Sequence, residues 1–357
     1  MLRILARLAA ALAVTAAPLL GTGVAAATDP PTTPIVNSLV GVGADVDQDL
    51  YTRFATAYDA SLTAAGDTRS FRFHSWGSDG SSPITPKLGA AAIARPRYGD
   101  AGITALANTT TATLDFARSA RRPRSNDRPA VFLPMARDAL TWAAPLNGNA
   151  PRNLTTQQLA NIYKCFSTDW GAFNPSAPLP STIRPFLPPP GSDLRALFLA
   201  ALGIFNTDEV GPCVGTVPGE NDGTDPLLNG PNAIVPYSVA RHLAQTYKGY
   251  SRPGSAPGQY VLRDINGIAP LARPESEVEL PYVPNIIFVN TAFGYPLSTV
   301  VRPQDWAAST AQGNALRAVF GPNGWICKDP VAQREIRNIG FLWMPPGRCG
   351  MTWTAPS

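Results

Sequence analysis

The sequence predicts an α/β fold with two domains, because of its length and because a strand–turn–helix pattern recurs along it. A chain of 357 residues has room for about two domains of ordinary size. Short apolar segments that end near glycine precede stretches with an apolar residue at every third or fourth position, which is typical of alternating strands and helices. Hydrophobic residues make up 45% of the chain, which is enough to bury a core and excludes global disorder.

The first strand–turn–helix unit lies near the N-terminus. Residues 35–42 read as a short buried strand followed by a glycine. The apolar positions after it predict an amphipathic helix of about fifteen residues; they are Leu50, Phe54, Ala57, Tyr58 and Leu62. Two later units repeat this order: residues 71–75 lead into a glycine-containing turn, and residues 187–190 lead into an apolar helix at 196–202.

Three further segments indicate how the chain is divided. Residues 130–144 read as two short strands around a polar turn, and residues 154–163 predict a helix with Thr155 or Thr156 as its N-terminal cap. Strand character returns at residues 280–289, after a region rich in Gly, Pro and Ser. We therefore expect two lobes between which the chain crosses twice. Lobe 1 is predicted at residues 35–135 and 285–350, and lobe 2 at residues 136–284.

The N-terminal 27 residues predict a secretory signal peptide. Arg3 and Arg7 precede an apolar run that ends in three alanines, so we expect cleavage near Ala27. A membrane anchor is disfavoured, because proline and two glycines interrupt the run. No cysteine lies near the cleavage site to carry a lipid, so the mature chain is expected to be secreted, extracellular or periplasmic.

The charge of the chain gives no indication of a nucleic-acid partner. Removal of Arg3 and Arg7 leaves 27 basic and 25 acidic residues in the mature chain, which is close to neutral. Nucleic-acid-binding domains usually carry a strong basic excess. We expect the protein to be a monomer and its partner to be a small molecule.

Four cysteines, Cys165, Cys213, Cys327 and Cys349, allow three disulfide pairings in an exported protein. Each sequential pair lies within one region of the chain, so we favour Cys165 with Cys213 and Cys327 with Cys349. A zinc site is the alternative, but no CxxC or CxxH spacing supports it.

Catalytic and cofactor motifs are missing from the sequence. Only two histidines occur, His74 on a predicted strand and His242 on a predicted helix. The patterns HExxH, GxSxG and SxxK are absent, and so are the GxGxxG and P-loop cradles for nucleotides. We therefore expect no enzymatic activity, no catalytic residues, no cofactor and no metal.

Several loops rich in Gly, Ser, Asp and Arg are suited to bind an oxyanion. Some precede helices, whose first N–H groups are unpaired and carry a partial positive charge. The loops lie at residues 43–47, 77–81, 118–121 and 191–195. Guanidinium groups bind phosphate or carboxylate with two bonds, which favours Arg118 and Arg121 as ligand residues. The alternatives are ordinary caps and turns for each loop and a solvated basic segment for residues 118–128.

Taken together, these loops carry a resemblance to a known family. The segments are LVGVGADVDQDLY at 39–51, LDFARSAR at 114–121, LTTQQLANIY at 154–163, PPGSDLRALF at 189–198, ENDGTD at 220–225 and PNAIVPYSVA at 231–240. In this order they resemble the phosphate-binding proteins of ABC importers, in the type 2 periplasmic-binding-protein superfamily, and especially their secreted actinobacterial relatives. The resemblance covers most of residues 36–345.

The resemblance implies two α/β lobes that close on an oxyanion, which is phosphate in the family. It also implies an ABC importer complex as a partner in transport. It implies a site whose residues come from four loops. By position these are Asp45, Val46, Ser78, Arg118, Ser119, Arg121, Ser192, Asp193, Leu194 and Arg195.

The sequence departs from the family at four of the matching positions. Ala120 stands where an acidic residue accepts the proton of phosphate, and Asp45 stands where a hydroxyl is usual; Asp193 and Leu194 replace a Gly and a Thr. Asp45 or Asp193 could share a proton with phosphate and so replace the missing acceptor. The alternative is an extracellular interaction or structural protein of the same fold that has lost or changed its small ligand.

Overall fold

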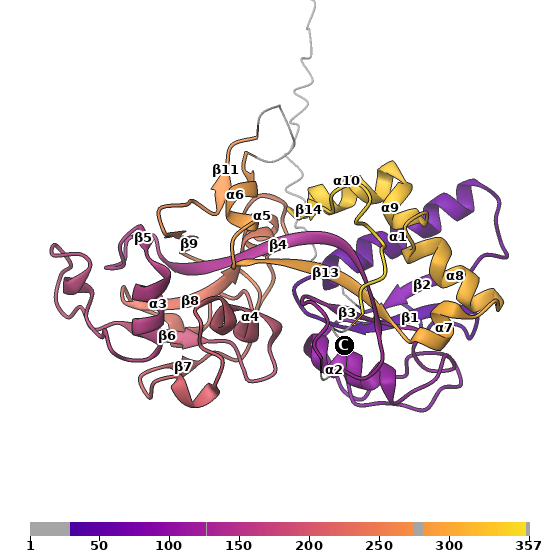
Figure 1. The fold of residues 1–357 in the computed structure, drawn as a ribbon, viewed down its shortest axis with the longest axis horizontal. Helices are drawn as coiled ribbons and strands as arrows, with labels where there is room; N and C mark the ends of the chain where they lie inside the picture. The colour runs from indigo at the N-terminus through magenta and orange to yellow at the C-terminus, as the bar shows by residue number, and fades with distance from the viewer. Residues whose placement is uncertain (1–28, 126, 275–280, 355–357) are drawn as a thin grey trace, which may run out of the picture.

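The computed structural model describes residues 29–125, 127–274 and 281–354, which form two lobes side by side (Figure 1). The predicted signal peptide lies outside the described residues. The two lobes share a sheet with the strand order β2-β1-β3-β13-β4-β8-β6-β7. The predicted α/β class is confirmed.

Lobe 1 has three parallel strands next to the crossing strand β13, with helices on both sides (Figure 1). Its strands are β1 (Ser38–Gly43), β2 (Arg72–Ser75) and β3 (Phe116–Ser119). Its helices are α1 (Gln48–Ala64), α2 (Tyr98–Ala107), α7 (Pro303–Ala307), α8 (Ala311–Phe320), α9 (Trp325–Lys328) and α10 (Pro330–Asn338). The predicted strand and helix at the N-terminus are thus confirmed.

Lobe 2 continues the sheet with shorter strands. They are β6 (Arg184–Leu187), β7 (Gly215–Thr216), β8 (Ala233–Ser238) and β9 (Tyr260–Leu262). Its helices are α3 (Thr156–Tyr163), α4 (Asp193–Ala201), α5 (Val239–Tyr247) and α6 (Ile286–Val289). Two small sheets have two strands each. One pairs β5 (Asn153–Leu154) with β10 (Asp264–Ile265), and the other pairs β11 (Leu271–Ala272) with β12 (Val283–Pro284). The short strand β14 (Leu342–Trp343) pairs with β4 of the main sheet. Three short 3₁₀ helices lie at Trp170–Ala172, Thr207–Glu209 and Pro226–Leu228.

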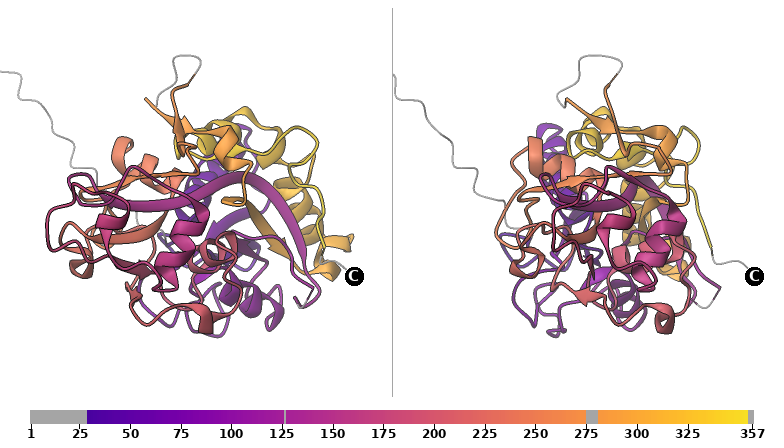
Figure 2. Two further views of the ribbon diagram at one scale, coloured as in Figure 1. Left: turned by 60° about the vertical axis from the view of Figure 1, so that its left-hand side comes forward. Right: turned by 90° about the vertical axis from the view of Figure 1, so that its left-hand side faces the viewer.

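The two lobes are joined by a pair of antiparallel strands, β4 (Val131–Pro145) and β13 (Gly294–Val301). Figure 2 shows from two further sides that β4 is curved along its length. The predicted boundary at residue 136 falls within β4, and the boundary at residue 285 falls at the start of α6. The lobe boundaries themselves stay a prediction.

The prediction of two short strands at residues 130–144 is wrong, because β4 is one continuous strand. The polar residue in its centre, Asp138, is buried rather than part of a turn. Its carboxylate accepts hydrogen bonds from the hydroxyls of Ser238 and Tyr295, both at 2.5 Å, and from the backbone N–H of Ala240 at 3.0 Å. These partners come from β8, β13 and α5, so Asp138 ties the crossing strands together.

The prediction of a strand at residues 280–289 is also corrected by the structure. Only Val283–Pro284 is a strand, and α6 follows it. The side chain of Asn285 caps α6 by accepting a hydrogen bond from the N–H of Ile287 at 3.0 Å, which favours a helix over an extended chain. The strand that returns to lobe 1 is β13, further along the chain.

Local sequence signals explain the remaining elements. Thr155 caps α3 as predicted: its hydroxyl accepts from the N–H of Gln158, whose side chain accepts from the N–H of Thr155. Both predicted disulfides are formed, with Cα atoms 6.0 Å apart for Cys165–Cys213 and 5.6 Å apart for Cys327–Cys349. Within the described residues, no helix is long and apolar enough to cross a membrane, and no cluster of His, Cys, Asp and Glu could hold a metal ion.

Candidate functional site

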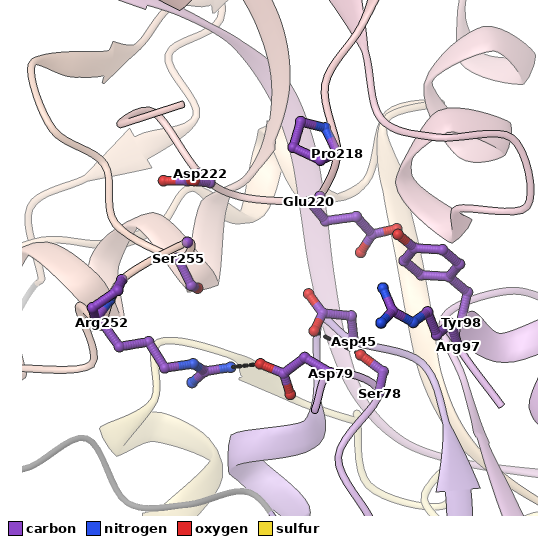
Figure 3. A pocket seen from close by; sticks show the side chains of 13 residues that line it. Asp45, Ser78, Asp79, Arg97, Tyr98, Pro218, Glu220, Asp222, Arg252 and Ser255 are labelled. Carbon is purple, nitrogen blue, oxygen red and sulfur yellow. Dashed lines mark hydrogen bonds and ion pairs between the residues drawn. The ribbon is translucent and has the colours of Figure 1, made fainter. Parts of the chain in front are cut away.

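A pocket of about 280 Å³ lies between the two lobes (Figure 3). Its size is near the lower end of the range for small-molecule sites. Lobe 1 contributes Asp45, Ser78, Asp79, Arg97 and Tyr98 to its walls. Lobe 2 contributes Pro218, Gly219, Glu220, Asp222 and residues 252–255.

Asp45 lies in the loop between β1 and α1. Gly43 begins this loop with a φ of +129°, and a Cβ there would collide with the backbone of Arg118, so only glycine permits the close approach. The Asp45 carboxylate accepts hydrogen bonds from the Ser78 hydroxyl at 2.8 Å and from the Gln48 side chain at 2.5 Å. Burial raises the pKa of Asp45, although the Arg241 guanidinium and the Ser78 hydroxyl act against this shift.

Glu220 approaches the pocket from lobe 2 and is only 3% exposed. Its Oε1 accepts hydrogen bonds from the Ser192 hydroxyl and from the N–H of Leu194, whereas Oε2 has no hydrogen-bond partner among the described residues. Burial raises the pKa of Glu220 well above its usual value, and the negative charges of Asp45 and Asp193 raise it further.

The segment that carries Glu220 is fixed by its neighbour Asn221. Asn221 has a φ of +53°, a left-handed conformation that asparagine tolerates better than most residues. Its side chain accepts a hydrogen bond from the N–H of Ser238 at 2.8 Å, and its carbonyl accepts one from the Tyr237 hydroxyl at 2.7 Å. Glu220 is therefore held at the pocket by bonds to the start of α5.

Tyr98 lines the pocket from the first position of α2. Its φ of +67° is unusual for a residue of this size, and such backbone strain tends to occur where a ligand is bound. Figure 3 shows its hydroxyl pointing toward the carboxyl group of Glu220 in the opposite lobe. Burial raises the pKa of Tyr98, and the nearby Glu220 adds to this shift.

The two guanidinium groups of the pocket differ in their surroundings. Arg252 pairs with Asp79 at 3.3 Å and with Asp49 at 3.1 Å (Figure 3). Arg97 is exposed and makes no ion pair within the part of the chain that the structure describes. Since four carboxyl groups share the walls with these two cations, the pocket has an excess of acidic groups.

Of the ten site residues predicted from the resemblance, Asp45 and Ser78 line this pocket. Val46 and Leu194 are buried in the apolar core instead. The ten assignments stay predictions.

Arg118 lies behind the pocket, fully buried. Its guanidinium donates to the backbone carbonyls of Ala44 at 3.0 Å, Trp76 at 2.8 Å and Gly43 at 3.1 Å. It also pairs with Asp47 at 3.3 Å. Burial raises the pKa of Asp47 to about 7, against the attraction of Arg118. In this structure Arg118 holds the loop that carries Asp45.

Of the neighbouring predicted residues, Arg121 lines a separate hollow of lobe 1 and Ser119 is buried beside it. Arg121 pairs with Asp100 and with Asp127, each at 2.7 Å, and these three residues line that hollow with Arg124. The Ser119 hydroxyl is buried and accepts a hydrogen bond from the N–H of Arg121 at 3.4 Å. The structure therefore places both away from the pocket between the lobes.

The predicted loop at the start of α4 supports the pocket from behind. The Ser192 hydroxyl caps α4 by accepting from the N–H of Arg195 at 3.1 Å, and it donates to Glu220. Asp193 accepts a hydrogen bond from the N–H of Gly99 at 2.7 Å, and the Arg195 side chain donates to the carbonyl of Pro188 at 3.0 Å.

Sequence reasoning did not assign the other charged and aromatic residues of the pocket to the site. They are Arg97, Tyr98, Glu220, Asp222 and Arg252, whereas Asp79 lies in the loop at residues 77–81 that the sequence indicated. Glu220 and Asp222 lie in one of the segments that carry the resemblance, which is the one signal that could have found them. Nothing in the sequence near Arg97, Tyr98 or Arg252 indicates that these residues meet.

Comparison with known proteins identifies the fold. The sequence profile of a family described as a PBP superfamily domain matches residues 97–278, about half of the chain. No curated protein matches the sequence. A phosphate ABC transporter substrate-binding protein from Clostridium perfringens, solved with bound phosphate, has a TM-score of 0.59 at 14% identity over 86% of this chain and 100% of its own. An ABC-type phosphate transport receptor from Vibrio cholerae has a TM-score of 0.55 at 16% identity, over 86% of this chain and 100% of its own.

Proposed function

This chain belongs to the PBP superfamily, and from that premise we propose that it is a solute-binding protein that holds a small ligand between its two lobes. The observation that carries the proposal is the pocket itself, because both lobes supply its polar walls. A ligand there contacts Asp45 and Ser78 from one lobe and Glu220 and Ser255 from the other. Contacts of this kind favour a closed arrangement of the lobes.

We propose binding rather than catalysis. The two structural neighbours are described as a substrate-binding protein and as a transport receptor. The fold is shared with them at low identity, so their roles support the proposal by analogy of fold. Export from the cytoplasm and delivery to an ABC importer belong to the same proposal; the two disulfides are consistent with an oxidising compartment.

Phosphate is the first ligand to test, because the resemblance predicts it and both neighbours are described in connection with it. The pocket offers an oxyanion the hydroxyl of Ser255 and the guanidinium of Arg97, which has no ion pair among the described residues. The Ser78 hydroxyl already donates to Asp45. The carboxyl groups of Asp45 and Glu220, whose pKa values are raised, would have to donate or share a proton with it.

The proposal is tested by thermal unfolding of the mature chain in the presence of phosphate, sulfate, sugars, amino acids and amines. A ligand at 100 times its Kd adds about 2.7 kcal/mol to the free energy of unfolding. This increment raises the Tm by several degrees.

A variant that fills the pocket locates the binding site. Gly219 lines the pocket, and a Cβ at this position would meet no atom within 4 Å, so Gly219→Trp can project a large side chain into the space. Leu179→Trp is the control, because Leu179 is 87% exposed and lies outside the pocket lining. We expect the ligand-induced shift to disappear in Gly219→Trp and to persist in Leu179→Trp. An unchanged shift in Gly219→Trp would contradict the proposed site.

A further inference from the structure

The walls of the interlobe pocket carry more negative than positive groups. Four carboxyl groups face two guanidinium groups. One of these, Arg252, is already engaged by Asp79 and Asp49. The other, Arg97, is exposed to solvent, where its attraction for an anion is weakened. Once these carboxyl groups are ionised, an anion that enters this pocket therefore meets repulsion that its cations do not offset.

Two carboxyl groups from opposite lobes approach each other across this pocket. Figure 3 shows Glu220 of lobe 2 above Asp45 of lobe 1, with the Glu220 carboxyl group directed toward the Tyr98 hydroxyl. The two groups are close enough for the charge of Asp45 to raise the pKa of Glu220. The Oε2 atom of Glu220 is buried and has no hydrogen-bond partner among the described residues. A buried polar atom without a partner is costly, so a ligand that displaces the proton of Glu220 and donates to Oε2 would stabilise the site.

The aromatic ring beside these carboxyl groups suits the same kind of ligand. Tyr98 lines the pocket next to Glu220 (Figure 3). Aromatic rings attract cations. The Tyr98 hydroxyl oxygen, which points toward Glu220 (Figure 3), can also accept a hydrogen bond from an ammonium or guanidinium group.

We propose that the pocket binds a small organic cation, with an ammonium or guanidinium group between Asp45 and Glu220. This inference rests on the proposed function, because it names the ligand class of that same pocket. The cation donates hydrogen bonds to both carboxyl groups, neutralises the acidic excess and bridges the lobes.

The charged groups around each carboxyl group determine how binding depends on pH. Asp45 faces the cations Arg241 and Arg252 and the acid Asp79. Glu220 faces the acids Asp45 and Asp193, together with the hydroxyl groups of Ser192 and Tyr98. Because the pKa values of both carboxyl groups are raised, the free protein retains protons on them at a higher pH than usual. A cation between them displaces these protons, so its binding releases protons and strengthens as the pH rises.

The sign of this proton exchange separates the two ligand classes. Phosphate between the same groups requires that they keep or gain protons, so its binding takes up protons and weakens as the pH rises. Calorimetric titration of the mature chain in two buffers with different ionisation enthalpies measures the number of protons exchanged. We use putrescine and agmatine as cationic probes and inorganic phosphate as the anionic probe, at pH 6, 7 and 8.

Two isosteric variants test the carboxyl groups directly. Glu220→Gln and Asp45→Asn keep the oxygens that accept the internal hydrogen bonds but remove the negative charges. Glu209→Gln is the control, because it removes a carboxyl group from the surface of lobe 2, outside the pocket lining. We expect a cationic probe to bind with proton release, tenfold or more weakly in each pocket variant and equally well in the control.

Three outcomes overturn the inference. If phosphate binds with proton uptake while neither cation binds, the ligand class is wrong but the proposed function stands. If a cation binds equally well to Glu220→Gln and to the unmodified chain, it does not occupy the site between the carboxyl groups. If neither these probes nor the wider ligand panel binds, the proposed function fails together with the inference.

Discussion

The carboxylate of Asp193 in lobe 2 accepts a hydrogen bond from the backbone N–H of Gly99 in lobe 1, at 2.7 Å. The bond joins the first turn of α4 to the first turn of α2, directly behind the pocket. The N-terminus of α2 favours a negative group at this position. Asp193 therefore connects the two lobes without a ligand.

Gly99→Ala is expected to break this connection. An added Cβ would lie 2.8 Å from one oxygen of the Asp193 carboxylate and 3.0 Å from the other, so the carboxylate must move away. At pH 8, where Asp193 is mostly ionised, the loss of a hydrogen bond to a charged group costs about 1.5–3 kcal/mol, measured as the free energy of unfolding in denaturant. In Gly219→Ala, whose Cβ would meet nothing within 4 Å, we expect little change. Equal stability of the two variants would contradict a role for the Gly99–Asp193 bond.

Asp193→Asn is expected to change how stability depends on pH. Burial raises the pKa of Asp193 to about 7, so between about pH 4 and 7 the folded chain holds a proton that the unfolded chain has lost. The contribution of Asp193 to the free energy of unfolding therefore falls as the pH rises through this window. An asparagine has no such dependence and can still accept the bond from Gly99.

The measurement is denaturant unfolding of both proteins at pH 5, 6.5 and 8. Relative to the unmodified chain, Asp193→Asn should gain about 2–3 kcal/mol between pH 5 and pH 8. Burial lowers the pKa values of the two histidines, so their contribution to the free energy of unfolding rises with pH. Both proteins contain these histidines, so this contribution cancels when the two free energies of unfolding are subtracted. A difference that stays constant with pH would show that Asp193 does not titrate in this range.

Arg118→Ala is expected to destabilise the fold more than it affects a ligand. The substitution leaves Asp47 as an unpaired buried group and removes the donor from three backbone carbonyls. Loss of one partner of a buried ion pair costs about 3–5 kcal/mol. If Arg118 instead bound an oxyanion directly, as the resemblance predicts, the substitution would lower oxyanion affinity by about 1.5–3 kcal/mol.

Unfolding in denaturant and calorimetric titration of the same variant separate these two roles. Arg122→Ala is the control, because Arg122 lies on the surface over the ring of Trp353. A folded, equally stable Arg118→Ala chain with weakened oxyanion binding would favour the role predicted from the resemblance.

Removal of each disulfide is expected to destabilise the oxidised chain. The loop-entropy relation gives about 4 kcal/mol for Cys165–Cys213, which closes 48 residues, and about 3 kcal/mol for Cys327–Cys349, which closes 22. The double serine variants and the unmodified chain are compared by denaturant unfolding without reductant. Losses below 1 kcal/mol would indicate that the unfolded chain is compact enough to gain nothing from the cross-links.

The sequence by itself determined the features that depend on nearby residues. The spacing of Leu50, Phe54 and Tyr58 is enough to predict α1, because the periodicity of a helix is local. The cap at Thr155 and the two disulfide pairs followed from short patterns and from proximity along the chain. The two-lobed α/β class followed from the order of these elements and from the resemblance.

The tertiary structure alone decided which polar groups meet. The sequence predicts Asp138 in a turn, because a polar residue in an apolar segment is usual there. Its hydrogen-bond partners Ser238 and Tyr295 are 100 and 157 residues away along the chain, so no local pattern could reveal them. Arg118 is predicted to bind the ligand, and the close packing of β1 and β3, which only the fold reveals, brings backbone carbonyls within reach of its guanidinium.

The pocket depends on the same long-range packing. Asp45 and Glu220 belong to different lobes, and only the crossing of β4 and β13 brings these lobes together. Local patterns report the conformational preference and burial of a residue, whereas the charge of a cleft is a sum over groups that folding assembles from distant segments. The class of ligand is therefore determined by that assembly.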